Sequence, residues 1–147
     1  MENKCPCCSG KPYEECCKPF HDGALPPTAL ALMRSRYSAY ALKKARYIME
    51  TTHPQSPYFE KNRKNWETDI LIFGTNYKFV KLEILDFSET QVHFAAHLEQ
   101  NGIPSVLEEK SHFQKIEGKW LYLNGEILNY PKQSPPNATA NAKKTGA

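Results

Sequence analysis

The chain has 147 residues, of which 40% are hydrophobic and 24% are charged, and its formal net charge is +3. This composition is typical of a globular domain with short appendages, and so small a positive excess does not indicate nucleic-acid binding through a basic field. No stretch reaches the roughly 18 apolar residues that a membrane helix requires, and no apolar segment resembling a secretory signal follows Met1, so the sequence predicts a cytoplasmic protein without membrane contact.

Four cysteines lie near the N-terminus, as Cys5 and Cys7 followed by the adjacent pair Cys16 and Cys17. The run Ser-Gly-Lys-Pro at 9–12 forms turns readily, so the two pairs can fold back on each other. Four thiolates in a tetrahedral array are a ligand set of structural zinc. A disulfide would need an oxidising compartment, and redox pairs more often have C-x-x-C spacing. The spacing predicts one structural Zn²⁺ bound by these four cysteines, with a redox relay as the alternative.

The segment 5–17 resembles the SEC-C motif, a small zinc knuckle. All four ligand positions are present, and Cys17 stands where family members carry Cys or His. The fifth cysteine, Cys8, stands where the family usually carries Gly, which adopts a positive φ at no steric cost. Three interpretations of Cys8 stay open: an alternative ligand, a reactive thiol or a small residue. The last is favoured.

A knuckle over residues 1–20 is too short to form a core, so its metal must supply its fold. It would present Lys11, Tyr13, Lys18 and Phe20 to a partner. The resemblance implies protein contact, because the SEC-C motif of the preprotein translocase motor contacts an export chaperone or the ribosome. The first predicted function is therefore a zinc-binding adaptor or protein-interaction protein.

Helical patterns follow a linker that contains proline and glycine. Thr28, after two prolines, is a predicted N-cap, and apolar residues recur at helical spacing over 29–44. A short second helix is predicted over 45–49, ahead of the His-Pro pair at 53–54. A third helix is predicted over 62–72, and Gly74 is its predicted end.

The apolar period then changes from helical to two, which predicts strands. These strands cover residues 78–87, 91–98, 106–116 and 120–123. Asn101-Gly102 and Glu117-Gly118 are hairpin-turn signals between them. In the first strand, Val80, Leu82 and Ile84 are predicted to share one face.

Helices followed by antiparallel strands predict an α+β domain over 24–130, with the helices packed on one face of the sheet. This order resembles the nuclear transport factor two-like fold, a cone with a strongly curved antiparallel sheet, here preceded by the zinc knuckle. The resemblance also suggests a homodimer through the outer face of the sheet. Residues 131–147 lack apolar periodicity and are predicted to be a disordered tail.

More narrowly, the pattern resembles the YchJ-like family of bacterial proteins. The matching runs are the knuckle, 32–40, 51–54, 109–113 and 118–122. The resemblance covers about residues 1 to 128. It implies the cone-like fold, but no established reaction comes with it.

One acidic side chain is predicted to enter the core. Glu109 and Ser111 share a strand face with Phe113, and an unpaired buried carboxylate is costly. The predicted partner is Arg34 on the first helix, and Arg36 is the second choice. Aromatic residues would surround this polar centre: Tyr37, Tyr40, Trp66, Trp120 and Tyr122.

Two interpretations of this centre stay open. The arginine–glutamate pair fixes helix against sheet, with the aromatic residues as core, or the cavity that the cone resemblance implies is a small-molecule site. In the second case Glu109 would act as acid or base and Arg34 as an anion clamp. His93 and His97 are favoured as solvated strand residues over a metal pair. No Ser/His/Asp arrangement, phosphate loop or paired-carboxylate motif is visible, so an enzyme is not favoured, and ligand binding or catalysis in the cavity is the alternative function.

Overall fold

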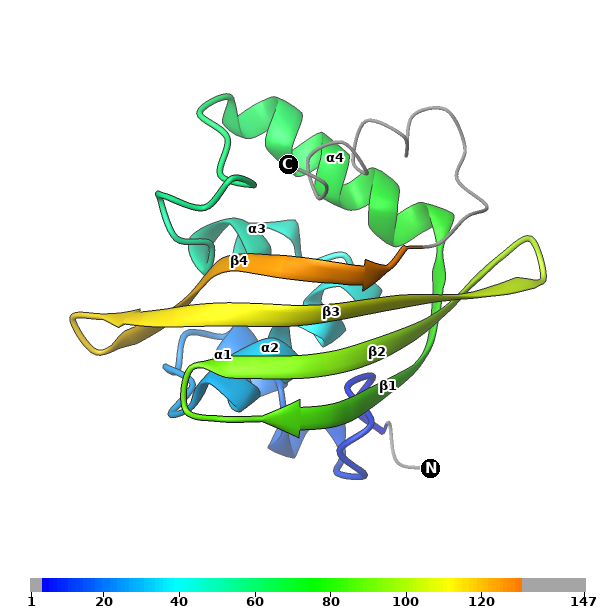
Figure 1. The fold of residues 1–147 in the computed structure, drawn as a ribbon, viewed down its shortest axis with the longest axis horizontal. Coiled ribbons are helices and arrows are strands. Elements are labelled where there is room, and N and C mark those ends of the chain that lie inside the picture. Colours follow the sequence, from blue (N-terminus) through cyan, green and yellow to red (C-terminus); the bar gives the residue numbers. More distant parts are fainter. Residues whose placement is uncertain (1–3, 131–147) are drawn as a thin grey trace.

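A computed structural model describes residues 4–130. Its elements are η1 (Tyr13–Glu15), α1 (Lys18–His21), α2 (Ala29–Ala41), α3 (Ala45–Glu50), α4 (Arg63–Asn76), β1 (Lys78–Phe87), β2 (Gln91–Gln100), β3 (Ile103–Ile116) and β4 (Lys119–Asn129). The fold is α+β, as predicted: one sheet in the order β1-β2-β3-β4, antiparallel throughout, with the helices on one side of it (Figure 1). The predicted tail at 131–147 lies outside the described residues.

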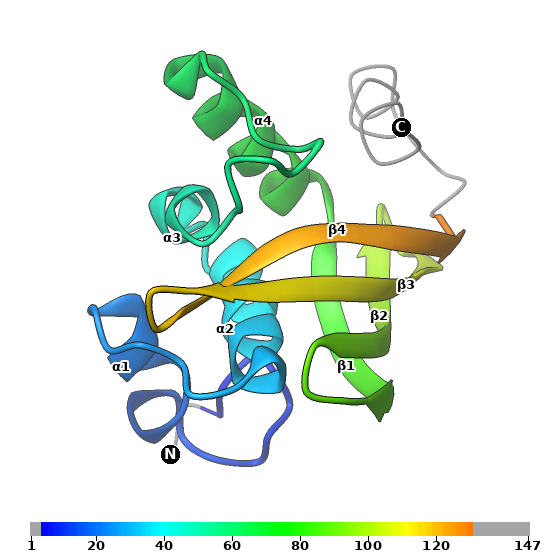
Figure 2. The ribbon, with the colours of Figure 1, turned by 60° about the vertical axis from the view of Figure 1, so that its left-hand side comes forward.

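Helix α2 lies at the centre of the molecule. It contacts α1, α3 and α4, and also the strands β1, β2 and β4. Figure 2 shows the curved sheet beside α2, with α3 and α4 towards one end of that helix and the N-terminal segment towards the other. Because α2 is covered on several sides, even its serines Ser35 and Ser38 are fully buried.

The predicted start of α2 is confirmed and its predicted end is wrong. The Thr28 hydroxyl accepts a hydrogen bond from the Ala31 amide at 3.0 Å, as an N-cap does. The helix ends at Ala41 because Lys43 adopts a left-handed φ of 61°. The Lys44 amide then donates to the Ala39 carbonyl at 2.7 Å, which closes the helix end.

Gly74 does not end its helix, because α4 continues to Asn76. A Cβ atom at Gly74 would lie 2.8 Å from the backbone oxygen of Tyr40 in α2. The glycine therefore permits a close approach of the two helices, and the prediction of a helix stop was wrong for that reason.

Both predicted hairpin turns are confirmed. Asn101 and Gly102 have φ of 52° and 80°, and Glu117 and Gly118 have φ of 51° and 83°. Two consecutive positive φ values are the mark of a type I′ turn, whose twist matches that of the strands. The strands that these turns join are longer than predicted, and β4 extends to Asn129 rather than ending at 123.

Buried and exposed side chains do not alternate regularly along β1. The pairing of β1 with β2 shifts between Phe79 and Lys81, which is a β-bulge at Val80. Val80 is consequently 52% exposed, while Phe79, Leu82 and Ile84 are the partly or fully buried residues of β1. The prediction that Val80 shares the inner face was wrong. The inner faces of β2 and β3 alternate as predicted.

Gly74→Ala is expected to destabilise the fold, although alanine is the better helix former. The contact with Tyr40 forces an overpacking cost of about 1–3 kcal/mol, which exceeds the helix-propensity gain of about 1 kcal/mol. Urea unfolding measures the difference. Thr75→Ala, at the exposed neighbour on α4, should leave stability unchanged or slightly raised. Equal stability of the two variants would contradict the close approach.

Candidate functional site

The four predicted ligand cysteines converge on one point. The Sγ atoms of Cys5, Cys7, Cys16 and Cys17 all lie within 4.8 Å of one another. Cys16 Sγ is 3.5 Å from Cys7 Sγ and 3.9 Å from Cys17 Sγ. A tetrahedron with metal–sulfur bonds of about 2.3 Å has sulfur–sulfur edges of about 3.8 Å. The donor set and its spacing therefore fit a four-coordinate metal ion, and these four cysteines could hold one.

The local backbone explains the convergence. The Cys5 amide donates to the Lys11 carbonyl at 2.9 Å, which closes the loop that carries Gly10 at a φ of 90°. The η1 turn then brings Cys16 back, with its amide 3.0 Å from the Tyr13 carbonyl. The turn chemistry seen in the sequence is thus the cause of the cluster.

The buried thiols of the cluster have unequal pKa values. Hydrogen bonding with Cys17 lowers the pKa of Cys7 to about 4 against the effect of burial. Burial raises the pKa of Cys5 to about 11, and the hydrogen bond to Cys7 raises the pKa of Cys17. A metal ion would displace the remaining protons, because thiolates are the ligands.

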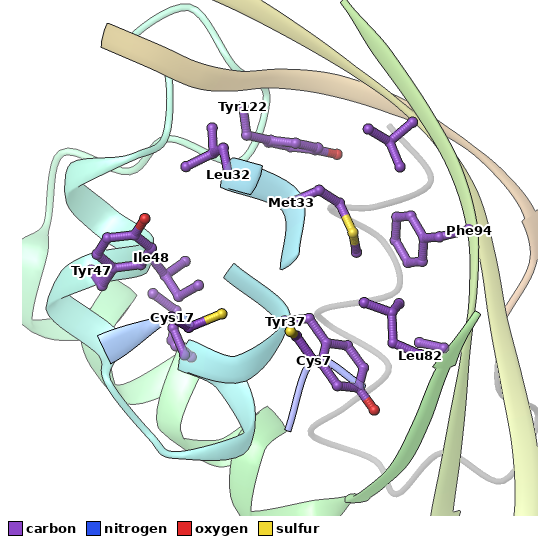
Figure 3. Close-up of a cluster of buried hydrophobic side chains, with 14 of the residues drawn as sticks. Cys7, Cys17, Leu32, Met33, Tyr37, Tyr47, Ile48, Leu82, Phe94 and Tyr122 are labelled. Carbon is purple, nitrogen blue, oxygen red and sulfur yellow. The ribbon is translucent and has the colours of Figure 1, made fainter. Parts of the chain in front are cut away.

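The cysteine knuckle packs against α2 and does not project from the domain. Arg34 Nη1 donates to the Cys7 carbonyl at 2.8 Å, and His21 Nε2 lies 2.9 Å from the Ser35 carbonyl. Cys7 and Cys17 are completely buried, and Figure 3 shows them among the core side chains. Arg34, the first predicted partner of Glu109, therefore binds the knuckle backbone and does not line the cavity.

Cys8 lies outside the cluster of four. It is exposed and has a φ of 66°, the left-handed conformation that the glycine of the SEC-C motif led us to expect. Its Sγ accepts a hydrogen bond from the Leu82 amide on β1 at 3.4 Å. The side chain thus connects the knuckle to the sheet.

Most of the residues predicted to face a protein partner have other contacts. Tyr13 packs against the core, and its hydroxyl is 2.7 Å from His21 Nδ1. Phe20 is half-buried against the same core. Lys18 pairs with Asp22 at 2.7 Å, and Lys11 is exposed.

A cavity of about 180 Å³ lies between the helices and the inner face of the sheet. It is lined by all the predicted pocket residues except Arg34 and Trp120, namely Arg36, Tyr37, Tyr40, Trp66, Glu109, Ser111, Phe113 and Tyr122. Trp120 is buried elsewhere, and its indole Nε1 donates to the Pro27 carbonyl at 3.2 Å. Further apolar walls come from α4 and the sheet.

The polar centre of the cavity is Glu109, which is only 7% exposed. The Tyr122 hydroxyl donates to Glu109 Oε2 at 2.6 Å. Burial raises the pKa of the Glu109 carboxyl, although hydrogen bonds from Tyr122 and Ser111 and the charge of Arg36 act in the opposite direction. A carboxyl in this state holds its proton to higher pH than an exposed one.

Arg36, the second predicted partner, lies near this centre without forming an ion pair. Its guanidinium carbon is 4.8 Å from the centre of the Tyr122 ring. Its Nη1 donates to Thr51 Oγ1 at 2.8 Å, Ile48 O at 3.1 Å and Thr52 Oγ1 at 3.2 Å. These bonds fix α2 against the end of α3.

Two contributors to the centre were missed in the sequence. A Cβ atom on Gly125 of β4 would overlap the Glu109 carboxyl, so this glycine provides the room for it. Gly125 lies beyond the strand predicted over 120–123, so its place inside β4 gave no signal in the sequence. Tyr58 also lines the cavity, with its ring 5.7 Å from that of Tyr122, and no sequence pattern marked it.

The two histidines of β2 are engaged on the outer face of the sheet. His93 Nε2 is 2.7 Å from Glu108 Oε2, and His97 Nε2 is 3.0 Å from Glu83 Oε1. Each histidine pairs with a different carboxylate, and neither histidine lines the cavity. Within residues 4–130, no helix is long and apolar enough to cross a membrane.

Residues 28–125 match the family model described as "YchJ, middle NTF2-like domain". A UPF0225 protein of Deinococcus radiodurans is 38% identical over 122 residues, which cover 82% of this chain and 86% of that protein. A UPF0225 protein of Actinobacillus succinogenes is 35% identical and covers 98% of this chain and 94% of its own.

Two solved structures are similar over most of the chain. The solution structure of a SEC-C motif containing protein from Rhodopseudomonas palustris has a TM-score of 0.69 at 31% identity, covering 88% of this chain and all of that one. The crystal structure of a SEC-C motif containing protein from Psychrobacter arcticus has a TM-score of 0.66 at 25% identity, covering 90% and 86%. The knuckle and the cone thus occur together in similar proteins.

Glu109→Gln is expected to gain stability relative to wild type as the pH rises. A carboxyl whose pKa is raised by folding contributes stability below its ordinary pKa, and this stability is lost as the pH rises through the folded-state value. Glutamine has no such proton to lose. The free energy of unfolding of both proteins, measured from about pH 4 to pH 8, should diverge in favour of the variant. A difference that stays constant over this pH range would contradict a carboxyl whose pKa is raised by burial.

Proposed function

The chain belongs to the YchJ family, and it combines a SEC-C motif with a nuclear transport factor two-like domain. We propose that it is a small-molecule-binding protein. The binding site is the cavity of the cone domain at 24–130, and the metal-stabilised knuckle at 1–20 contacts helix α2 through Arg34, which does not line the cavity. The observation that carries the proposal is the combination of a cavity with a buried carboxyl and an arginine that do not pair with each other.

The chemistry of the cavity supports binding more than structural cross-linking. If Glu109 and Arg36 served only to fix helix against sheet, direct pairing would satisfy both groups at once. Instead the walls are mostly aromatic and aliphatic, with a few converging polar groups, which is the usual form of a small-molecule site. The raised pKa of Glu109 would also suit an acid or base, so catalysis on the bound molecule is compatible with this proposal.

We assign one structural Zn²⁺ to Cys5, Cys7, Cys16 and Cys17. Four thiolates complete a tetrahedral shell and leave no position for a substrate, so zinc would supply stability and no reaction step. Such a site needs reduced thiols, which supports a proposed location in a reducing compartment such as the cytoplasm.

Protein interaction through the knuckle is the second candidate function. Its support is the exposed side of the knuckle, where Lys11, Glu14 and Glu15 lie. It ranks below the cavity because Tyr13 and Phe20, the apolar residues that would anchor a partner, pack inward.

The zinc assignment is tested by elemental analysis of the purified chain. Wild type should contain one zinc per chain, and Cys5→Ser/Cys16→Ser should contain none and unfold at a lower urea concentration, because the cluster is part of the core. Cys8→Ser is the matched control, since Cys8 lies outside the cluster and should keep the metal. Zinc loss in the control, or another metal in reduced wild type, would contradict the assignment.

The cavity is tested by a fragment screen against the full chain, with ligand-observed NMR as the readout. Leu107→Trp places a larger side chain on the half-buried cavity wall and should abolish binding of the hits. Leu128→Trp changes an exposed leucine outside the cavity and should not. Hits that bind both variants equally, or no hits at all, would rule out the cavity as the binding site.

A further inference from the structure

The donors around the cavity restrict the ligand, and this step rests on the proposed function. All the hydrogen bonds of Arg36 to the described residues leave from Nη1. Nε and Nη2 therefore make none within 4–130, although Arg36 lines the cavity. Arg36 also forms no ion pair with a carboxylate of this part of the chain. One face of its guanidinium lies over the Tyr122 ring, but its positive charge and the Nε and Nη2 donors remain available to a ligand.

Tyr40 adds a second unused donor beside Arg36. The ring of Tyr40 lines the cavity, and no hydrogen bond connects its hydroxyl to another described residue. Burial raises the pKa of Tyr40. The charge of Arg36 opposes this rise and the charge of Glu109 adds to it, so the hydroxyl lies close enough to interact electrostatically with both groups. The cavity thus offers a cation and a neutral O–H donor next to the Glu109 carboxyl.

A group that fits between Arg36 and Glu109 must accept hydrogen bonds on one side and meet a carboxyl on the other. A carboxylate does both, because it accepts from a guanidinium and a phenol and accepts the O–H of a neutral carboxyl. The Tyr122 hydroxyl is already used on Glu109 Oε2 at 2.6 Å. An amine would instead place a second cation beside Arg36, at an electrostatic cost.

The remaining walls define the body of the ligand. Phe73, Phe79, Phe94, Leu98 and Trp66 are among the lining residues. A volume of about 180 Å³ gives room for roughly 12 non-hydrogen atoms, if each needs about 15 Å³, the cavity volume that holds one water molecule. This is the size of one aromatic ring with a short side chain.

We propose that the cavity binds a small monocarboxylic acid with an aromatic or similarly apolar body, and that its carboxylate lies between the guanidinium of Arg36, the hydroxyl of Tyr40 and the carboxyl of Glu109. Asp69 also lines the cavity and would repel such an anion from the wall of α4. The charge of Arg36 therefore sets both the class of the ligand and its orientation.

The test uses three acids of increasing length, benzoate, phenylacetate and 3-phenylpropionate, each paired with its primary amide, and phenethylamine as the cationic probe. Protein-observed NMR on the full chain measures their dissociation constants. At least one acid should bind tenfold or more tightly than its amide and than the amine, with resonance shifts at cavity residues. Removal of a charge-assisted hydrogen bond predicts about a tenfold to hundredfold loss in Arg36→Met.

Further variants separate binding from folding. Tyr40→Phe removes one hydroxyl and should weaken the acid about threefold to tenfold. Glu109→Gln keeps a donor at this position and should change acid affinity by less than about threefold. Arg34→Met, which removes an equal charge two residues away on the knuckle side of α2, should leave affinity unchanged in the folded fraction.

The outcomes are distinguishable from those of the fragment screen. Tighter binding of an amide or of the amine would overturn the ligand class and leave a small-molecule site in place. The same holds if none of the acids binds while other fragments occupy the cavity. If no molecule of any class binds, the proposed function itself fails. Equal effects of Arg36→Met and Arg34→Met would show that Arg36 does not contact the ligand.

Discussion

The arrangement of the domain depends on the burial of one carboxyl group on the inner face of a curved sheet. Glu109 is removed from water, and a buried acid needs hydrogen bonds and space. Tyr122 supplies a short hydrogen bond, and Gly125 on the neighbouring strand leaves the space. Arg36 forms no ion pair with this carboxyl, and both side chains line the cavity. The polar centre and the cavity are two consequences of the same packing.

Helix α2 connects this cavity to the cysteine cluster. Arg34 and Arg36 are two residues apart, which places them about 200° apart around a helix. One side chain therefore contacts the knuckle through the Cys7 carbonyl, and the other contacts the end of α3 beside the cavity. The knuckle therefore packs on the same helix that forms one wall of the cavity. This gives a structural reason for the two modules to occur in one chain.

Features set by local sequence could be predicted. Three such features depend on neighbours in the chain: the convergence of the four cysteines, the Thr28 cap and the two turns with consecutive positive φ. The burial of Glu109 was also predictable, because alternation on β3 continues through it. The α+β fold followed from the change of apolar period along the chain.

Features set by distant contacts could not be predicted. Periodicity does not tell which side of α2 faces the knuckle, since the helix is buried on several sides, and so Arg34 was preferred to Arg36. Gly74 and Gly125 are small because of a helix and a carboxyl far away in sequence, and the bulge at Val80 depends on pairing with β2. A high-resolution crystal structure of the metal-loaded protein tests the cavity most directly. We expect an open cavity with ordered solvent or ligand between Arg36 and Glu109, and a collapsed cavity with the guanidinium bonded directly to the carboxyl would contradict this expectation.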